Sequence, residues 1–349
     1  MTPLERKKLI NDVFEPKFGE RILLIVDLPH DNIFDTASWK DRRKLAKDWY
    51  QTLKSMGEEK GFNVDFFEYL ATGKPNGPLP ELVKNKVRKS NLFFAMTEFS
   101  ATSSLVSICQ DEDSTTRGAS MPRVERRMEE TAMKADYTKI QQYATFLKII
   151  LDESIAAEIC FSSGDKLFID LRNREAGADK GECKQSGQII NFPSGEAWKA
   201  PYEGTLEESK KFGESKTQGI LPSSYNGELV KYFVKQNCIS DIFGKGKIAS
   251  KMKELFDEND SRRNIAELGI GCNPSAVVTG NILEDEKAGL HIAYGMSTHL
   301  GGKVVSDLHQ DISYSKGCPI EAFSVILLNK DGAKTNIIKN SELQYELLK

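Results

Sequence analysis

The sequence has no uninterrupted apolar run that approaches the roughly 18–20 residues needed to span a bilayer. Residues 1–18 are amphipathic and charged, so they lack the continuous apolar core of a signal peptide. The formal net charge is only −3, which gives no electrostatic argument for binding nucleic acid or an anionic membrane. We therefore expect a cytoplasmic protein that has neither nucleic acid nor a membrane as its partner.

Cysteine is scarce and poorly placed for cross-linking. The six cysteines are spread over 349 residues, and no two of them form a CxxC pair. This pattern argues against a disulfide framework and against a zinc ribbon, and it is typical of a protein from a reducing compartment.

The first part of the chain alternates strand-like and helix-like patterns. Residues 21–28 (RILLIVDL), 62–70 and 91–96 are apolar runs typical of strands buried in a parallel sheet. Between the first two runs, apolar residues recur at helical spacing. Such alternation predicts βαβ units, so we expect an α/β N-terminal domain with a parallel sheet over residues 1–135.

The rest of the chain has short apolar runs separated by polar and glycine-containing turns. The runs 265–270, 289–295 and 304–312 are examples, and they predict strands. We expect a strand-rich α+β C-terminal domain over residues 136–349. The polar segment 110–124, which precedes it, is predicted to be a loop.

Histidine is rare, but its placement is informative. Three of the four histidines, His291, His299 and His309, lie close together in the sequence. Histidine is the commonest transition-metal ligand, and carboxylates complete sites for Zn, Co, Mn or Fe. In SDLHQD, His309 and Asp311 would point to the same face of a strand and could share one ion. Taken alone, such a pair is more often a simple hydrogen-bonded pair.

Two glutamates extend this candidate site. Glu267 lies in the apolar run IAELGIG, where an unpaired carboxylate is costly to bury and a metal would satisfy it. An exposed strand end would explain Glu267 equally well, and Glu196 in FPSGEAWKAP would alone be read as solvated. The ordered combination is more specific than any single member. It predicts a metal site in the C-terminal domain, and the residues are Glu196, Glu267, His291, His309 and Asp311.

These motifs resemble the aminopeptidase T family of metallopeptidases, the M29 group of thermophilic or leucyl-type aminopeptidases. The similar segments are TTRGASMPR (115–123), FPSGEAWKAPYEG (192–204), ELGIGCNP (267–274), GNILEDEK (280–287), HIAYG (291–295) and HQD (309–311). The resemblance implies a homodimer with two divalent ions, Zn, Co or Mn, in the C-terminal domain. It implies a metal-dependent aminopeptidase-like hydrolase that removes N-terminal residues from peptides with metal-activated water.

The resemblance also implies roles for individual residues. The same five residues occupy the family's ligand positions, and Glu196 or Glu267 would accept the proton of the attacking water. The family usually has a tyrosine a few residues after its first histidine, whereas this chain has Met296-Ser297-Thr298-His299 there. His299 is therefore a third catalytic candidate, or else a residue of a polar turn.

A second interpretation uses fewer ligands. The same superfamily resembles a branch of mononuclear Fe(II) dioxygenases that open dihydroxypyridine rings. His291, His309 and Asp311 alone would form a set of two histidines and one carboxylate, which leaves open positions on iron. A non-catalytic relative that keeps the fold is a third interpretation. Because both glutamates are present, we expect the two-metal aminopeptidase, with a small peptide or another small molecule as its substrate.

Two further features have less specific patterns. The charged segment GNILEDEKAG (280–289) would be either a solvated turn or a source of contacts to the metal ligands. Arg117 would hold the fold together or bind a substrate carboxylate, and the structural role is the first choice.

Overall fold

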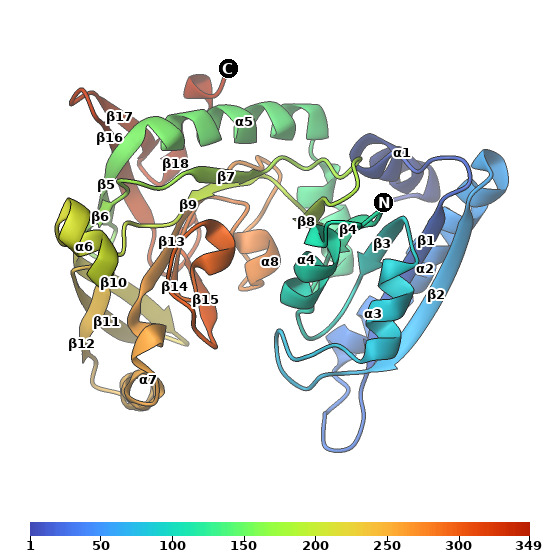
Figure 1. The fold of residues 1–349 in the computed structure, drawn as a ribbon, viewed down its shortest axis with the longest axis horizontal. Helices are drawn as coiled ribbons and strands as arrows, with labels where there is room; N and C mark the ends of the chain where they lie inside the picture. Colours follow the sequence, from blue (N-terminus) through green and yellow to red (C-terminus); the bar gives the residue numbers. More distant parts are fainter. The chain divides into compact units, whose positions relative to one another are not determined.

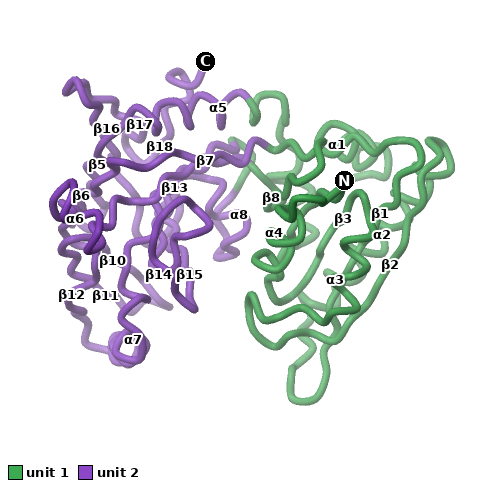
Figure 2. The backbone as a smooth tube through the Cα atoms, in the orientation of Figure 1, with its two compact units in different colours: residues 1–141, 181–194, 274–276 green, residues 142–180, 195–273, 277–349 purple.

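The structure is a computed structural model that describes all of residues 1–349. Two compact units divide the chain, and both are discontinuous in sequence (Figure 2). Unit 1 comprises Met1–Gln141, Gly181–Ser194 and Pro274–Ala276, and unit 2 comprises Gln142–Lys180, Gly195–Asn273 and Val277–Lys349. The domain boundary between residues 135 and 136 stays a prediction. No helix is both long enough and apolar enough to cross a membrane.

Unit 1 contains a five-stranded sheet in the order β2-β1-β3-β4-β8, and all neighbouring strands are parallel (Figure 1). The strands are β1 (Arg21–Leu28), β2 (Asn63–Leu70), β3 (Leu92–Ala95), β4 (Arg117–Ser120) and β8 (Ile189–Asn191). The helices are α1 (Pro3–Phe14), α2 (Ala37–Lys60), α3 (Glu81–Arg88) and α4 (Thr102–Gln110), with 3-10 turns η1 (Arg126–Glu129) and η2 (Ala132–Lys134). A parallel sheet with helices confirms the mixed α/β character predicted from the sequence.

Local sequence explains how β1 and α2 form. The interior residues of β1 are all buried, as expected for a strand that is covered on both faces. The Thr36 hydroxyl accepts a hydrogen bond from the Trp39 backbone N–H at 3.1 Å and caps the start of α2. Gly61 ends the helix in the left-handed region, with φ of 77°, a conformation that glycine adopts without steric cost.

The loop predicted for residues 110–124 is wrong in part, because β4 lies within it. Arg117 begins this buried strand and forms a bidentate ion pair with Glu20, at 2.7 Å from Nη1 and 3.1 Å from Nη2. Its guanidinium also donates to the carbonyls of Cys183 and Phe14. A charged residue can enter a buried strand when all its donors are satisfied in this way. The preferred prediction for Arg117, a structural role, is therefore confirmed.

Unit 2 contains two antiparallel sheets. The larger has the order β12-β11-β10-β6-β5-β16-β17-β18, and the smaller has the order β15-β14-β13-β9-β7 (Figure 1). The larger sheet comprises β5 (Ser154–Phe161), β6 (Lys166–Asp170), β10 (Gln218–Tyr225), β11 (Glu228–Lys235), β12 (Cys238–Phe243), β16 (Ala322–Asn329), β17 (Lys334–Lys339) and β18 (Glu342–Leu343). The smaller comprises β7 (Ala176–Asp179), β9 (Glu196–Lys199), β13 (Ile265–Gly271), β14 (Leu290–Gly295) and β15 (His309–Ser313).

Helices in unit 2 are few. They are α6 (Leu206–Phe212), α7 (Lys247–Asp257) and α8 (Ile282–Asp285), with the 3-10 turns η3 (Asp260–Arg263), η4 (Thr298–Leu300) and η5 (Tyr345–Leu347). Helix α5 (Tyr137–Glu153) begins in unit 1 and ends in unit 2.

The two faces of the smaller sheet have different roles. On β13 and β14, Leu268, Ile270, Leu290 and Ile292 belong to the hydrophobic core that the smaller sheet shares with β5, β6 and β16. Side chains alternate between faces along a strand, so the residues between these belong to the opposite face. That opposite face is where the candidate metal ligands lie.

The strand predicted over 304–312 is misplaced, because β15 begins only at His309. The backbone N–H groups of Lys303 and Val304 donate to the carboxylate of Glu203 and not to a neighbouring strand. Residues 296–308 consequently form a loop between β14 and β15.

Candidate metal centre

Strand register places all five predicted ligands on one face of the smaller sheet. Residues directly opposite each other in antiparallel strands share a face, and so do residues two apart on one strand. The register pairs are Glu196–Gly271, Glu267–Ala293, Gly269–His291, Ala293–Asp311 and Gly295–His309. Three adjacent strands, β13, β14 and β15, thus supply four of the five side chains, and β9 supplies Glu196.

Glu267, His309 and Asp311 form the tightest cluster. Each offers one ligand atom, and these atoms lie within 4.8 Å of one another. His309 Nε2 lies 3.3 Å from Glu267 Oε2 and 3.5 Å from Asp311 Oδ1. Glu267 is buried, being 5% exposed, so its charge requires compensation. The alternative of an exposed strand end is therefore excluded for Glu267.

The orientation of His309 is fixed by the backbone. Its Nδ1 lies 2.7 Å from the carbonyl oxygen of Met296, and a carbonyl can only accept, so Nδ1 carries the proton. In the neutral ring, the unprotonated Nε2 then faces two carboxylates. These acceptors repel one another unless a proton or a metal ion lies among them. The hydrogen bond from Nδ1 to the Met296 carbonyl is of the type that metal-binding histidines make with their other nitrogen.

His291 completes the pair of histidines. Its Nε2 lies 3.4 Å from Glu267 Oε1 and 3.5 Å from Glu196 Oε2, and its Nδ1 has no hydrogen-bond partner. The ring lies over Gly269, where an added Cβ would come within 2.6 Å of Cδ2 and closer still to Nε2. Glycine at this position therefore makes room for the His291 ring.

Glu196 differs from the other carboxylates because a lysine binds it. Lys287 Nζ is fully buried and lies 2.6 Å from Glu196 Oε1 and 2.7 Å from Glu286 Oε1. Gly271 leaves room for the backbone of Glu286 and Lys287, since a Cβ there would overlap their carbonyls. The segment GNILEDEKAG thus supplies buried contacts to Glu196 and is not a solvated turn.

The pKa shifts follow from this burial and charge. Burial alone would lower the pKa of His291, but the hydrogen bond and charge of Glu267 raise it to about 10. Burial would likewise lower the pKa of His309, and Asp311 and Glu267 raise it well above its usual value. Burial raises the pKa of Glu286 to about 8, against the opposing charge of Lys287.

The excess of negative charge suits a divalent cation. The cluster contains four carboxylates and one ammonium group, that of Lys287. If the histidines are neutral and every carboxylate is ionised, three negative charges are in excess. The carboxylates are those of Glu196, Glu267, Glu286 and Asp311. Protons on the histidines or a metal ion can balance this excess, and metal binding displaces such protons. The residues present therefore fit a divalent metal.

His299 lies next to the cluster but outside it. Its ring packs edge-on against His309, with centroids 4.7 Å apart and an interplanar angle of 78°. Burial and the neighbouring His309 lower the pKa of His299 to about 4, so the ring is neutral near pH 7. A neutral imidazole has one unprotonated nitrogen, which can accept a hydrogen bond from a molecule bound beside it.

The structure brings all the sequence-predicted site residues together, and their roles as ligands or catalysts stay predictions. Sequence reasoning missed two charged residues. Lys287 was hidden in a charged segment, and Glu203 lies seven positions after Glu196 in the motif already singled out. The one indication of Glu203 in the sequence is its position between Tyr202 and Gly204, at the end of the motif FPSGEAWKAPYEG.

Comparisons with known proteins show a similarity of fold. No protein-family model matches the chain, and no curated protein matches it. Among solved structures, the fold is similar to that of 2,5-dihydroxypyridine dioxygenase from Pseudomonas putida KT2440, with a TM-score of 0.67 over 100% of both chains. The two sequences are 12% identical, so this similarity shows the fold and does not by itself show the activity.

The assignment to the aminopeptidase T family is contradicted by this similarity. The expectations of a hydrolase and of a metallo-aminopeptidase were wrong, because the structural neighbour is an oxygenase. The motifs correctly brought together histidine and carboxylate side chains on one sheet face, and their role as ligands stays a prediction. Such ligands serve both water activation and oxygen chemistry, so they do not distinguish the two reactions.

Proposed function

We propose that the chain is a mononuclear Fe(II)-dependent dioxygenase that cleaves the ring of a dihydroxylated pyridine or benzene. The ion would be held by His291, His309 and Asp311. Two histidines and one carboxylate form the ligand set of non-haem Fe(II) oxygenases, and this set leaves positions for dioxygen and for a hydroxyl oxygen of the substrate. The fold of the structural neighbour supports the same reaction class.

The buried ion pair of Lys287 with Glu196 is the observation that carries this proposal. A second divalent ion bound through Glu196 would lie close to a fully buried ammonium group, 2.6 Å from the Oε1 atom. Charges repel strongly in a buried environment, where water does not screen them. Glu196 is therefore better suited to neutralise Lys287 than to bind a second metal, which favours one ion over two.

The remaining residues have proposed roles in binding. His299, whose ring packs against His309, would accept a hydrogen bond from a substrate hydroxyl as the ring of the substrate approaches the ion. Glu267 lies beside the Nε2 atoms of both histidines, so its carboxylate would lie next to the ion and would compensate part of its positive charge. In the overall reaction one ring carbon–carbon bond breaks and both atoms of O2 enter the product, so no external reductant is consumed.

Oxygen uptake tests the proposal directly. Protein purified and loaded with Fe(II) under anaerobic conditions would be mixed with a panel of dihydroxylated pyridines and benzenes. We expect one substrate to consume one O2 per ring opened, and His309→Ala to abolish this uptake. His30→Ala is the matched control, because His30 belongs to unit 1 and contacts Asp31 and the Ala71 carbonyl, neither of which belongs to the cluster. Uptake that is independent of substrate, or equal in the His309→Ala variant, would overturn the proposal.

The homodimer stays a prediction. Its test is the mass of the untagged protein in solution, by light scattering.

A further inference from the structure

The loop formed by residues 296–308 is long for a connection between two antiparallel strands. Hairpin loops usually have about two to five residues, and much longer loops are uncommon and often functional. This loop carries His299 in η4 and leads directly into His309. Its conformation therefore sets the distance between His299 and the metal ligands.

The loop closes on itself through Ser297. The Ser297 backbone N–H donates to the carbonyl of Val304 at 3.0 Å, and the N–H groups of Leu300 and Gly302 donate to the carbonyl of Ser297 at 2.9 and 3.0 Å. These bonds define a turn over residues 297–304, with His299 inside it. They do not attach the turn to the rest of unit 2.

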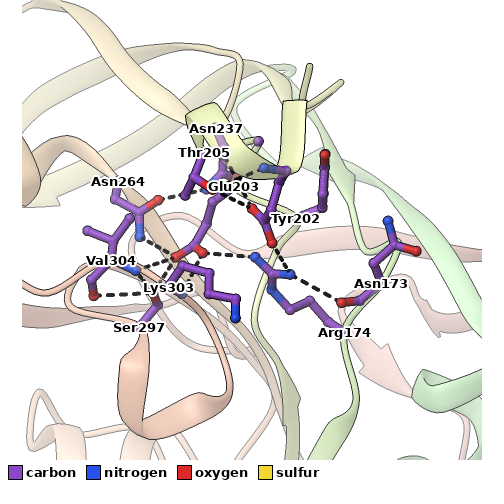
Figure 3. A network of polar contacts seen from close by, with 12 residues as sticks. Asn173, Arg174, Tyr202, Glu203, Thr205, Asn237, Asn264, Ser297, Lys303 and Val304 are labelled. Atoms are coloured by element: carbon purple, nitrogen blue, oxygen red, sulfur yellow. Dashed lines mark hydrogen bonds and ion pairs between the residues drawn. The ribbon is translucent and has the colours of Figure 1, made fainter. Parts of the chain in front are cut away.

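The carboxylate of Glu203 provides that attachment (Figure 3). It accepts hydrogen bonds from the backbone N–H of Lys303 at 2.6 Å and of Val304 at 3.2 Å. It also accepts a short hydrogen bond from the Ser297 hydroxyl. One carboxylate thus binds three donors that lie on both sides of His299 in the turn.

Glu203 is itself held rigidly. It is 7% exposed, and it accepts a hydrogen bond from Arg174 Nη2 at 2.9 Å and from Asn264 Nδ2 at 3.3 Å. Asn264 Nδ2 also donates to the carbonyl of Gly295, the last residue of β14. The carboxylate therefore joins the turn to the end of the strand that carries His291.

We propose that Glu203 is a positioning residue, which fixes the turn 297–304 and so holds His299 next to the metal ligands. This inference rests on the proposed function for the role of His299, but the attachment of the turn does not. In Glu203→Gln one acceptor oxygen becomes an NH2 group, so at least one of the three loop donors would face another donor, the turn would loosen and His299 would move. A displacement of about 1 Å in a catalytic group can reduce the rate roughly 100-fold.

Glu203→Gln is the test variant, and Glu208→Gln is its matched control. Both carboxylates bind Arg174, with Glu208 Oε1 at 2.6 Å from Nη1, but only Glu203 contacts the turn. The metal ligands are unchanged in both variants, so iron content should stay equal to that of the wild type. We expect kcat for ring cleavage to fall roughly 10- to 100-fold in Glu203→Gln and less than twofold in Glu208→Gln.

Two measurements test the attachment without any activity. Hydrogen exchange of the Lys303 and Val304 amides should become at least about tenfold faster in Glu203→Gln and should stay unchanged in Glu208→Gln. In Zn(II)-loaded protein labelled with ¹⁵N-histidine, which has only four histidines, the imidazole signals of His299 should shift in that variant. Unchanged exchange and unchanged His299 signals would refute the positioning role even if the protein is an active dioxygenase.

A second variant protects the test against misfolding. At Gly302 an added Cβ would overlap the Ser297 hydroxyl and lie 2.9 Å from Glu203 Oε1. Gly302→Ala should therefore loosen the same turn without removing any charge. If the altered exchange and His299 signals appear while ring cleavage is absent in the wild type too, the attachment holds and the proposed function fails.

Discussion

Removal of the buried ammonium group of Lys287 should destabilise the protein strongly. Lys287→Met keeps the unbranched chain as far as Cε but leaves Glu196 and Glu286 without their shared partner, which lies at 2.6 and 2.7 Å from them. Breaking a buried ion pair by removing one member costs about 3–5 kcal/mol. With roughly 2–4 °C per kcal/mol, the midpoint of thermal unfolding should fall by about 6–20 °C.

A double-mutant cycle identifies the source of that loss. Glu196→Gln in the Lys287→Met background removes one of the two uncompensated carboxylates, so the double variant should be more stable than the sum of the single effects predicts. We expect a coupling energy of at least about 1 kcal/mol. Thermal unfolding of the four proteins, loaded with the same metal, measures it. A midpoint for Lys287→Met within about 1 °C of the wild type, or additive effects, would refute the idea that Lys287 neutralises Glu196.

Two other expectations concern the residues that surround the site. Gly269→Ala places a methyl group against the His291 ring, so the metal content of the protein should fall by at least half. Gly118→Ala is the control, because its methyl group would overlap Phe93 in the parallel sheet. This control should lower the midpoint of thermal unfolding and leave the metal content unchanged. The hydrogen bond and charge of Arg262 lower the pKa of the Asp307 carboxyl to about 2. Because this folded pKa lies below the ordinary 3.8, the contribution of the Arg262–Asp307 pair to stability is present above about pH 4 and is lost as the pH falls through about 2. In Arg262→Ala the pKa of Asp307, measured by NMR titration of the carboxyl, should rise toward 3.8, and an unchanged pKa would contradict this attribution.

The sequence was sufficient to predict which residues meet in the cluster because their pattern is local. In β15, His309 and Asp311 are two apart and therefore share a face. Glu267 stands out as a carboxylate within an apolar strand, and that strand is buried throughout. Apolar runs likewise predicted β1 and the parallel sheet, because a strand covered on both faces has few polar residues.

Contacts between distant segments could not be predicted in the same way. Lys287 reaches Glu196 from 91 positions along the chain, in space that Gly271 leaves open, and no local pattern indicates this. Residues 304–308 have the apolar pattern of a strand. In the structure they belong to the loop 296–308, whose amides at Lys303 and Val304 donate to Glu203, 100 and 101 positions away. β4 was missed because Arg117 makes the segment look solvent-exposed, although its partners bury it.

The reaction class was mispredicted for a chemical reason. Histidine and carboxylate ligands can bind either zinc for hydrolysis or iron for oxygen chemistry, so the ligand types did not distinguish the two reactions. The count of five candidate ligands favoured two ions. Only the pairing of Glu196 with Lys287 reduces the set available to metal.

Metal identity and stoichiometry test the central claim most directly. Untagged protein would be purified anaerobically without chelators and analysed for Fe, Zn, Co and Mn by elemental analysis. The account predicts close to one Fe per chain, lost in His309→Ala and retained in His30→Ala. Two Zn, Co or Mn ions per chain, or no bound metal, would contradict it.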